Sequence, residues 1–366
     1  MPADLSEYTT LRVGGPAREL LAATSADQLV ETMLDVWATG EPWLVLGGGS
    51  NVLIGDAGFD GTVVRVESRG IELRDDAAPG TVRLRVQAGH PWDALVAHAV
   101  EQGWAGIEGL SGIPGSTGAA PIQNIGAYGQ ELAESLVSIE FLDYLSGELV
   151  TLTAAELELD YRTSVLKQGR LGAVISVDLS LVPHNDGLSE PIAYDQLAGA
   201  LGVAVGARVP LAQVRETVLA LRASKGMVLS ETDPDSVSAG SFFTNPIVGE
   251  NFARTLPEAA PRWLMEPEPG DRVVPLGEEP APPAARSDFR VKLSAAWLIE
   301  RAGIGRGFSL PGSRAAISSK HTLALTNRGG ATAEEIASLA RYVQTRVLSE
   351  FGVRLHPEPV FVGVDL

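Results

Sequence analysis

Residues 109–129 read GLSGIPGSTGAAPIQNIGAYG, and this stretch decides the fold. It contains six glycines and two prolines without a helical or alternating period, yet Ile113, Ile122, Ile125 and Tyr128 are interleaved with them. Glycine is needed where φ is positive or where the backbone approaches a neighbour closely, and successive peptide N–H groups form an anion-binding concavity. A loop of this length and composition inside a compact protein is usually functional, so we expect it to hold a ligand by its backbone.

A second glycine loop follows the strand-like segment Trp43–Leu46. It reads Leu46-Gly47-Gly48-Gly49-Ser50-Asn51. Two backbone cradles of this kind suit a long ligand that carries a diphosphate in its middle. The alternative is that both are tight packing loops, but that explanation suits either loop alone better than the pair.

Length and composition indicate a soluble globular protein of two or three domains. The chain has 366 residues, of which 45% are hydrophobic, and it contains no cysteine. The absence of cysteine excludes disulfides, thiolate metal ligands and a cysteine nucleophile. The net charge of −18, without a compensating basic block, argues against nucleic-acid binding. A site for an anionic substrate must therefore gather its Arg and Lys residues locally.

The N-terminus gives no sign of export. Its residues lack the apolar core of a signal peptide, and no uninterrupted apolar run approaches the roughly 18 residues of a membrane-spanning helix. We therefore expect a cytoplasmic protein without membrane insertion. A monomer is also expected, although the sequence contains no signal for the oligomeric state.

Local patterns predict strands and helices that do not alternate strictly, which favours an α+β fold over a doubly wound α/β fold. Capping boxes at Ser25, Thr153 and Thr332 and a proline at position 91 predict four helix starts. Two further helices are predicted over residues 211–222 and 294–302. The predicted strands are residues 43–46, 62–66, 81–87, 139–145, 149–152 and 173–182.

The composition changes after Lys225. Eight of the 23 prolines lie between Gly249 and Asp288, in a Glu-rich segment without a regular period. We interpret this segment as an extended surface insertion that is partly mobile.

Several kinds of site have no support in the sequence. No G-x-G-x-x-G motif follows a predicted strand, so a separate nicotinamide-binding domain is not expected. No G-x-S-x-G motif surrounds Ser241, which excludes a hydrolase nucleophile there. His356 and Glu358 form one i, i+2 pair without a third ligand nearby, so no metal site is expected.

Three segments downstream of the loops carry polar residues in settings that suit chemistry: Tyr161-Arg162-Thr163-Ser164, Ala239–Pro246 (AGSFFTNP) and Leu355–Val360 (LHPEPV). An arginine fork can bind a carboxylate through two parallel hydrogen bonds. A serine hydroxyl can deliver a proton in a desolvated site. A glutamate between two prolines is held rigidly.

Together with the two glycine loops, these segments resemble the UDP-N-acetylenolpyruvoylglucosamine reductase family, flavoenzymes that complete UDP-N-acetylmuramic acid for peptidoglycan. The resemblance extends from about Tyr8 to Val360, except for the Pro-rich segment. It implies an α+β protein with a two-part FAD-binding fold of the PCMH/vanillyl-alcohol-oxidase type and a smaller α+β substrate domain. The implied domains are residues 1–70 with 352–366, residues 71–222, and residues 223–351, with the insertion at about 249–288.

The resemblance implies FAD as cofactor and NADPH as reductant, with NADPH reducing the flavin in the pocket that the substrate later uses. The implied reaction is reduction of UDP-N-acetylglucosamine enolpyruvate to UDP-N-acetylmuramate. The residues that the resemblance assigns to FAD are Gly47, Gly48, Gly49, Ser50, Asn51, Ser111, Pro114, Gly115, Ser116, Gly118, Ile125, Gly126, Tyr128 and Gly129.

The resemblance also implies a catalytic set of Arg162, Ser241 and Glu358. Hydride would pass from flavin N5 to the enol methylene carbon, and the resulting negative charge would spread into the substrate carboxylate. Arg162 and Glu358 would stabilise this enolate, and Ser241 would donate the proton. Taken alone, an arginine in the position of Arg162 is more often a solvated or salt-bridged residue, and the alternative for Ser241 is a loop-capping hydroxyl.

Four residues are implied in substrate binding: Tyr194, Lys225, Asn245 and Lys292. Tyr194 would mark the branch of the family with a tyrosine-bearing loop over the pocket. The alternatives are that Tyr194 packs on the surface and that Lys225 is a charge at a helix C-terminus.

Two other functions are compatible with part of the pattern. A flavin oxidase acting on a sugar or alcohol would share the glycine loops, with His90 as a possible covalent tether for FAD, but it would not need Ser241 and Glu358. A non-catalytic flavin-binding module would leave the catalytic set unexplained. The remaining histidines, His98, His184 and His321, are interpreted as structural.

Overall fold

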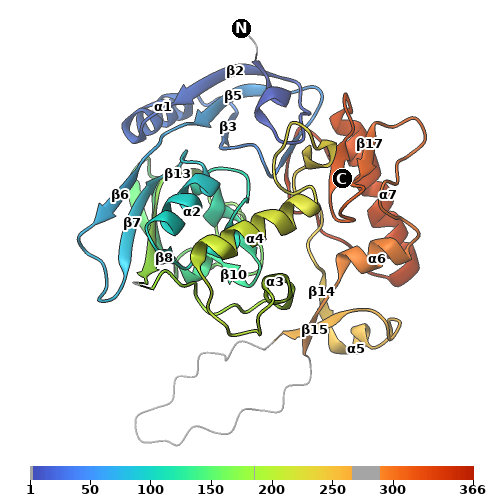
Figure 1. Cartoon of the computed structure of the whole chain (residues 1–366). Coiled ribbons are helices and arrows are strands. Elements are labelled where there is room, and N and C mark those ends of the chain that lie inside the picture. The colour runs from blue at the N-terminus through green and yellow to red at the C-terminus, as the bar shows by residue number, and fades with distance from the viewer. Residues whose placement is uncertain (1–2, 185, 266–288) are drawn as a thin grey trace, which may run out of the picture.

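The computed structural model describes residues 3–184, 186–265 and 289–366. Figure 1 shows three groups of elements: an N-terminal sheet, a larger second sheet with helices beside it, and a C-terminal group of helices and short strands. The described helices and strands confirm the mixed α+β organisation.

The first sheet has the strand order β1-β2-β5-β3. Both β2 and β3 run parallel to β5, and β1 is antiparallel to β2. A separate parallel pair joins β4 to β19, near the C-terminus, so the end of the chain returns to the N-terminal region. The strands are β1 (Ala3–Asp4), β2 (Pro16–Ala23), β3 (Trp43–Leu46), β4 (Val52–Ile54), β5 (Phe59–Val66) and β19 (Val360–Val362).

Helix α1 (Ala26–Ala38) links β2 to β3 and packs between the first sheet and the second. Ser25 caps it by accepting a hydrogen bond from the backbone N–H of Gln28, as the capping box predicts. Its buried side chains, Leu29, Met33 and Val36, pack in one cluster with residues of β5 and of the second sheet. This shared core fixes the first sheet against the second.

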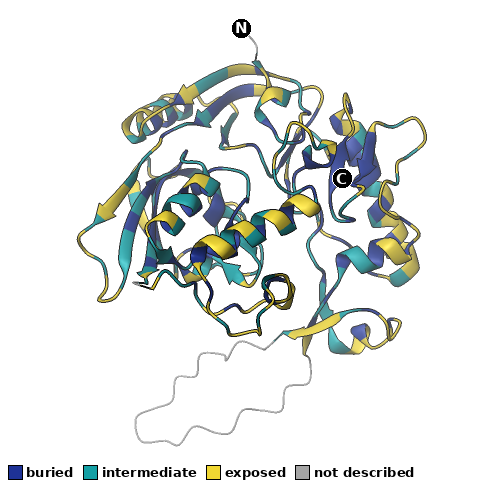
Figure 2. Ribbon diagram, viewed as in Figure 1, coloured by how far each residue is buried: buried dark blue, intermediate teal, exposed yellow. Residues whose placement is uncertain are grey.

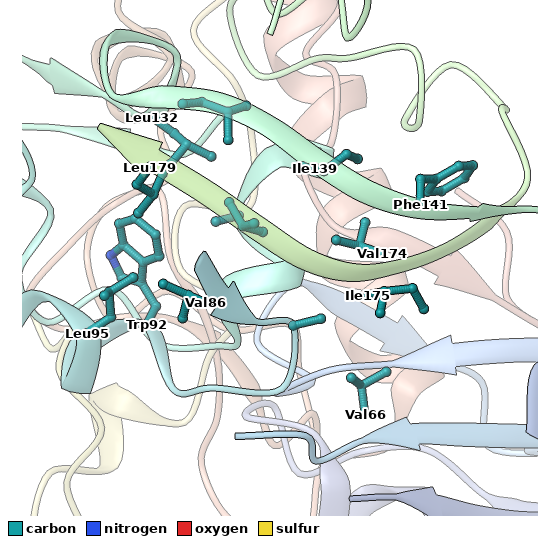
Figure 3. Close-up of a cluster of buried hydrophobic side chains, with 14 of the residues drawn as sticks. Val66, Val86, Trp92, Leu95, Leu132, Ile139, Phe141, Val174, Ile175 and Leu179 are labelled. Atoms are coloured by element: carbon teal, nitrogen blue, oxygen red, sulfur yellow. The ribbon is translucent and has the colours of Figure 1, made fainter. Parts of the chain in front are cut away.

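The second sheet is antiparallel, with the order β12-β11-β13-β7-β6, and β8 also pairs with β13. Leu84, Val86, Val177 and Leu179 alternate along β7 and β13 and point into the core with Trp92 of α2. Figure 3 shows Val86, Leu179 and Trp92 of this cluster close to one another. The elements are β6 (Ile71–Arg74), β7 (Val82–Gln87), α2 (Trp92–Glu101), β8 (Trp104–Ala105), β11 (Leu136–Asp143), β12 (Leu149–Thr153) and β13 (Gly172–Pro183).

The long glycine loop is fastened to the turn between β7 and α2. Gly118 N donates to Ala88 O, Thr117 N donates to His90 O, and Trp92 N donates to Gly115 O. The loop therefore has a defined course despite its lack of period. Its short elements are η2 (Glu108–Leu110), η3 (Thr117–Ile122), β9 (Gly126–Ala127), β10 (Gln130–Glu131) and η4 (Leu132–Glu134).

Helices α3 (Asp195–Leu201) and α4 (Leu211–Ser224) pack on each other over a small core of their own. The buried residues of α4, which include Val214 and Val218, lie on one side, and the opposite side is exposed (Figure 2). Helix α4 ends at Lys225, which is its C-cap.

The C-terminal group is built around the long helix α7, whose N-terminus carries the predicted capping box of Thr332 and Glu335. Its buried face shares a core with Phe242 and Phe243 and with Leu11, Val13 and Leu53 of the N-terminal region. The elements are η5 (Pro234–Ser236), β14 (Ile247–Gly249), α5 (Glu250–Ala253), β15 (Arg262–Met265), β16 (Arg290–Leu293), α6 (Ala295–Arg301), β17 (Ala315–Ile317), β18 (Leu325–Asn327) and α7 (Ala333–Phe351).

The structure contradicts one helix prediction. Thr153 and Glu156 do make the reciprocal capping hydrogen bonds, since Glu156 N donates to Thr153 Oγ1 and Thr153 N donates to Glu156 Oε2. The residues that follow form turns and no helix. Glu158 adopts a φ of +47°, a conformation that a right-handed helix cannot contain.

The interpretation of Gly249–Asp288 as an extended, aperiodic insertion is wrong for its first part. Residues 250–265 contain α5 and β15, and β15 pairs with β16. Ala253, Leu256 and Ala260 are buried in the C-terminal core, which anchors this part. The rest of the segment, residues 266–288, lies outside the described residues. The predicted partial mobility of the segment therefore stays a prediction.

Candidate functional site

A cavity of about 650 Å³ lies where the three groups of elements meet. Its wall includes both glycine loops, part of β13, the end of α4, and short segments around Ser241, His321 and Glu358. Residues that are far apart in the sequence therefore share one space.

The two glycine loops lie against each other along this wall. A Cβ on Gly47 would lie 2.3 Å from Ser116 Oγ, and one on Gly48 would lie 2.7 Å from Gly115 Cα. Gly49 adopts a φ of +60°, and a Cβ there would lie 1.9 Å from the Tyr8 carbonyl oxygen. These glycines are thus required for the close packing of the loop against its neighbours, and Gly49 also for its left-handed backbone conformation.

Most of the residues assigned to FAD line this cavity. They are Gly47, Gly48, Gly49, Ser50, Asn51, Pro114, Gly115, Ser116, Gly118, Ile125, Gly126 and Tyr128. Ser111 and Gly129 are not part of the wall. Ser111 is fully buried, and its hydroxyl donates to Glu108 O at 2.6 Å. Gly129 lies beside Ala193 and Tyr194.

Arg162 is held in a strained backbone conformation, with a φ of +56°. Its Nη1 donates to Asn124 O at 3.1 Å and its Nη2 donates to Gly126 O at 2.6 Å. Its Nε lies 3.5 Å from Glu358 Oε1. Both Nη atoms of the guanidinium therefore hold the glycine loop. The sequence analysis considered the fork as a bidentate site for a carboxylate, but in the structure these two donors are already in use.

The segment around Glu358 is fastened at several points. Glu358 N donates to Phe242 O, and Glu358 O accepts from Lys167 Nζ at 3.0 Å and from Asn51 Nδ2 at 3.3 Å. The side chain is only 14% exposed. Burial raises the pKa of Glu358, although the positive charges of Arg162 and Lys167 oppose this effect.

Ser241 lies on the cavity wall, and the two phenylalanines that follow it are buried in the C-terminal core. Phe242 and Phe243 therefore anchor the segment, which explains two aromatic residues in a glycine-containing loop. The Ser241 Oγ lies 3.5 Å from His321 Nε2. His321 also lines the cavity, so its interpretation as a purely structural histidine is incomplete.

Positive charge gathers at the end of the cavity near α4. Arg222 and Lys225 both line it. Lys225 Nζ donates to Gln196 Oε1 at 2.9 Å and lies 5.5 Å from the centroid of the Tyr128 ring, which itself makes an edge contact with Tyr194. Two of the assigned substrate residues, Tyr194 and Lys225, are thus brought together.

Arg222 is buried, with 7% of its surface exposed, and burial lowers its pKa. Its Nη2 donates to Met227 O, but within the described residues its Nε has no hydrogen-bond partner. A buried guanidinium without a carboxylate in contact calls for an anion from outside the protein.

The other two assigned substrate residues, Asn245 and Lys292, are not part of the cavity wall. Asn245 accepts from Ala295 N at the start of α6, and its backbone N donates to Tyr161 Oη at 3.4 Å. Lys292 Nζ lies 5.1 Å from the centroid of the Tyr161 ring. Both residues contact Tyr161, which is not part of the cavity wall either.

Lys167, Arg222 and His321 are among the cavity residues that sequence reasoning did not assign to the site. Lys167 stands three positions after the segment Tyr161–Ser164, and Arg222 stands three positions before Lys225. Both were therefore close to residues already singled out. Nothing in the local sequence marks His321, because its position depends on a contact with a residue 80 positions away.

Other kinds of site receive no support from the part of the chain that the structure describes. There, no group of three or more His, Cys, Asp or Glu residues could hold a metal ion. No described helix is both long and apolar enough to cross a membrane. His90, considered as a flavin tether, is not part of the cavity wall, and burial lowers its pKa.

Comparisons with known proteins agree with this geometry. Residues 17–153 match the FAD binding domain family, and residues 233–362 match the family described as UDP-N-acetylenolpyruvoylglucosamine reductase, C-terminal domain. The UDP-N-acetylenolpyruvoylglucosamine reductase of Leifsonia xyli is 60% identical over 100% of this chain and 99% of its own. That of Salinispora arenicola is 50% identical over 99% and 95%.

Among solved structures, the UDP-N-acetylenolpyruvylglucosamine reductase from Thermus caldophilus superposes with a TM-score of 0.63 at 26% sequence identity, covering 99% of this chain and 98% of its own. The two family matches and the full-length relatives lead to one conclusion: the chain belongs to the UDP-N-acetylenolpyruvoylglucosamine reductase family.

Proposed function

We propose that the protein is an FAD-containing, NADPH-dependent oxidoreductase that reduces UDP-N-acetylglucosamine enolpyruvate to UDP-N-acetylmuramate for peptidoglycan synthesis. The observation that carries this proposal is the single cavity in which the two glycine loops meet Arg162, Ser241 and Glu358. Full-length relatives that bear the name of this reductase support it.

The residues present fit the cofactor. The glycines of residues 47–49, which lie on the cavity wall, let this loop pack against Ser116, Gly115 and Tyr8, and peptide N–H groups in such loops suit a diphosphate. When bound and reduced by NADPH, FAD supplies the hydride that the enol ether accepts at its methylene carbon. The cavity would hold the substrate against the same wall.

Arg162 and Glu358 are proposed to stabilise the negative charge that spreads into the substrate carboxylate. Burial raises the pKa of Glu358, and its protonated form can donate a hydrogen bond where a carboxylate would repel the enolate. Preorganised donors of this kind commonly contribute about 10²–10³ in rate. Lys167 and Asn51, which bind the Glu358 carbonyl, keep this residue in place.

Ser241 is proposed to donate the proton to the substrate carbon next to the carboxylate. Tyr194 and Lys225 are proposed to bind the UDP part of the substrate, at the positively charged end of the cavity. Asn245 and Lys292, which both contact Tyr161, are proposed to contribute to substrate binding. The presence of Tyr194 agrees with the family branch that carries a tyrosine in the substrate loop.

We propose the following domain division: residues 1–70 with 352–366, residues 71–222, and residues 223–351. Pairing of β19 with β4 supports the inclusion of the C-terminal tail in the first domain. We also propose that the protein acts as a monomer in the cytoplasm, which sedimentation of the purified protein and cell fractionation would test.

An anaerobic titration tests the function. NADPH should bleach the yellow flavin, and UDP-N-acetylglucosamine enolpyruvate should restore its colour. An oxidase would instead be reduced by a sugar or alcohol and reoxidised by oxygen. A binding module would show neither half-reaction, so either of these outcomes would refute the proposal.

A further inference from the structure

We propose that His321 is a positioning residue for Ser241 and that it takes up a proton from solvent when an anionic substrate binds beside Lys225 and Arg222. This inference rests on the proposed function, in which Ser241 donates the proton to the substrate.

The contact between the two residues is built by the fold. The Ser241 Oγ lies 3.5 Å from His321 Nε2, and no other hydrogen bond of the Ser241 side chain is found within the described residues. Phe242 N donates to Leu323 O at 2.7 Å, which ties the two segments together directly beside this contact. His321 N also donates to Ser318 Oγ, which holds the turn that carries the imidazole.

The state of the imidazole decides where the serine proton points. A hydroxyl has one proton and two lone pairs. If Nε2 carries a proton, it donates to Oγ, and the serine proton is free to point into the cavity. If Nε2 lacks a proton, the hydroxyl donates to Nε2 and its proton points away from the substrate. His321 therefore controls whether Ser241 is ready to act as an acid.

The surroundings disfavour a charged imidazole before the substrate binds. Burial lowers the pKa of His321 to about 4, together with the positive charges of Lys225 and Arg222 from α4 and of Arg306. Glu300 of α6 acts in the opposite direction but more weakly. At neutral pH the imidazole is therefore uncharged in the free protein.

An anion bound at this end of the cavity changes the balance. Arg222 and Lys225 both line this end of the cavity, and neither forms an ion pair with a carboxylate within the described residues, which favours an anionic ligand there. Two negative charges of a diphosphate would offset Lys225 and Arg222 and would favour the imidazolium. The pKa of His321 would then rise, although burial would still oppose the charged form, and substrate binding would draw a proton from water.

The proton balance closes without a further reagent. The Ser241 O–H bond breaks as the new C–H bond forms on the substrate, and the hydroxyl becomes an alkoxide. The Nε2–H bond of the His321 imidazolium then breaks as the serine O–H bond forms again. The imidazole returns to its neutral state, and one proton from solvent has reached the product.

Proton uptake tests the first half of this proposal. The oxidised protein, which cannot turn over, is mixed near pH 7 with UDP-N-acetylglucosamine enolpyruvate in weak buffer containing a pH indicator. We expect the unchanged protein to take up a proton in an amount that approaches one per bound substrate. His321→Gln should bind the substrate without this uptake. His184→Gln, which changes a histidine paired with Glu190 outside the cavity wall, should take up the same amount as the unchanged protein.

Flavin reoxidation tests the second half. The proteins are reduced with dithionite and mixed with the same substrate in a stopped-flow instrument between pH 6 and 9. In the unchanged protein the rate should fall as the pH rises through the His321 pKa of the complex. His321→Ala should react at least tenfold more slowly. His321→Gln, whose amide donates but does not titrate, should recover part of the rate and lose the pH dependence.

Equal proton uptake by the unchanged and His321→Gln proteins, or uptake by neither, would overturn the proposal. Retention of the full pH dependence in His321→Gln would also overturn it. A merely structural role would lower the melting temperature of His321→Gln and leave its pH profile unchanged. If the substrate does not reoxidise even the unchanged protein, the proposed function itself is wrong, and that result is separate from those on the variants.

Discussion

Ser241→Ala separates the two half-reactions, because Ser241 is assigned only to the second. The substitution removes a hydroxyl that contacts His321 and leaves the cradle for FAD intact. We therefore expect NADPH to bleach the flavin at close to the normal rate. Reoxidation by UDP-N-acetylglucosamine enolpyruvate should become much slower, since its proton donor is missing.

The size of the effect follows from the geometry. A positioned proton donor contributes about 10²–10⁴ in rate, which corresponds to about 3–5 kcal/mol at 1.36 kcal/mol per decade. Stability should change by less than about 1 kcal/mol, because the buried Phe242 and Phe243 anchor the segment and the hydroxyl makes only one long hydrogen bond.

Stopped-flow absorbance at the flavin band, run separately for each half-reaction, measures this effect. Ser241→Cys serves as the matched variant, because a thiol can deliver a proton from the same position, and it should restore part of the rate. Equal slowing of both half-reactions, or of neither, would refute the assignment. A large drop in melting temperature with small effects on both rates would show that the hydroxyl only stabilises the loop.

Three further predictions concern the cradle, the second sheet and the cofactor. Gly49→Ala should lower the ratio of flavin absorbance to protein, because its Cβ would lie 1.9 Å from the Tyr8 carbonyl oxygen; full flavin content would contradict this. Asp178→Asn should lower the free energy of unfolding in urea by about 3–5 kcal/mol, because this carboxylate, 2% exposed, pairs with Arg83 and Arg85. Burial alone would raise the pKa of Asp178, but hydrogen bonds from Arg85 and Arg83 lower it overall. This stabilisation should therefore be complete above the unfolded pKa of about 3.9 and be lost as the pH falls through the lower folded value, as urea titrations at several pH values can check. Finally, acid-precipitated protein should release its FAD into the supernatant, whereas flavin that stays with the precipitate would support a covalent tether.

Much of the secondary structure could be predicted from the sequence, because short-range patterns control it. The capping box at Thr332 and the helical period of residues 211–222 correspond to α7 and α4. The box at Thr153 shows the limit of such reasoning. Its local hydrogen bonds form, but the left-handed conformation of Glu158 turns the chain away from a helix.

The strand Pro16–Ala23 was missed, since much of it is exposed and its hydrophobic pattern is weak. It is stabilised mainly by its pairing with β5, which starts some 40 residues later. Similarly, residues 250–265 lack a recognisable period but are anchored by Ala253, Leu256 and Ala260 in the C-terminal core. Both cases depend on partners that a local pattern does not contain.

For the site, the sequence by itself determined which residues have suitable chemistry. The glycines of the two loops stand out at short range, and the resemblance to the reductase family singles out Arg162, Ser241 and Glu358. Only the tertiary structure decided how they are used. In it, the Arg162 guanidinium donates hydrogen bonds to the carbonyl oxygens of Asn124 and Gly126. Glu358 is buried, and His321 contacts Ser241. The physical reason is that burial, charge interaction and hydrogen bonding depend on the distances between residues in space. The number of residues between two positions in the chain does not specify these distances.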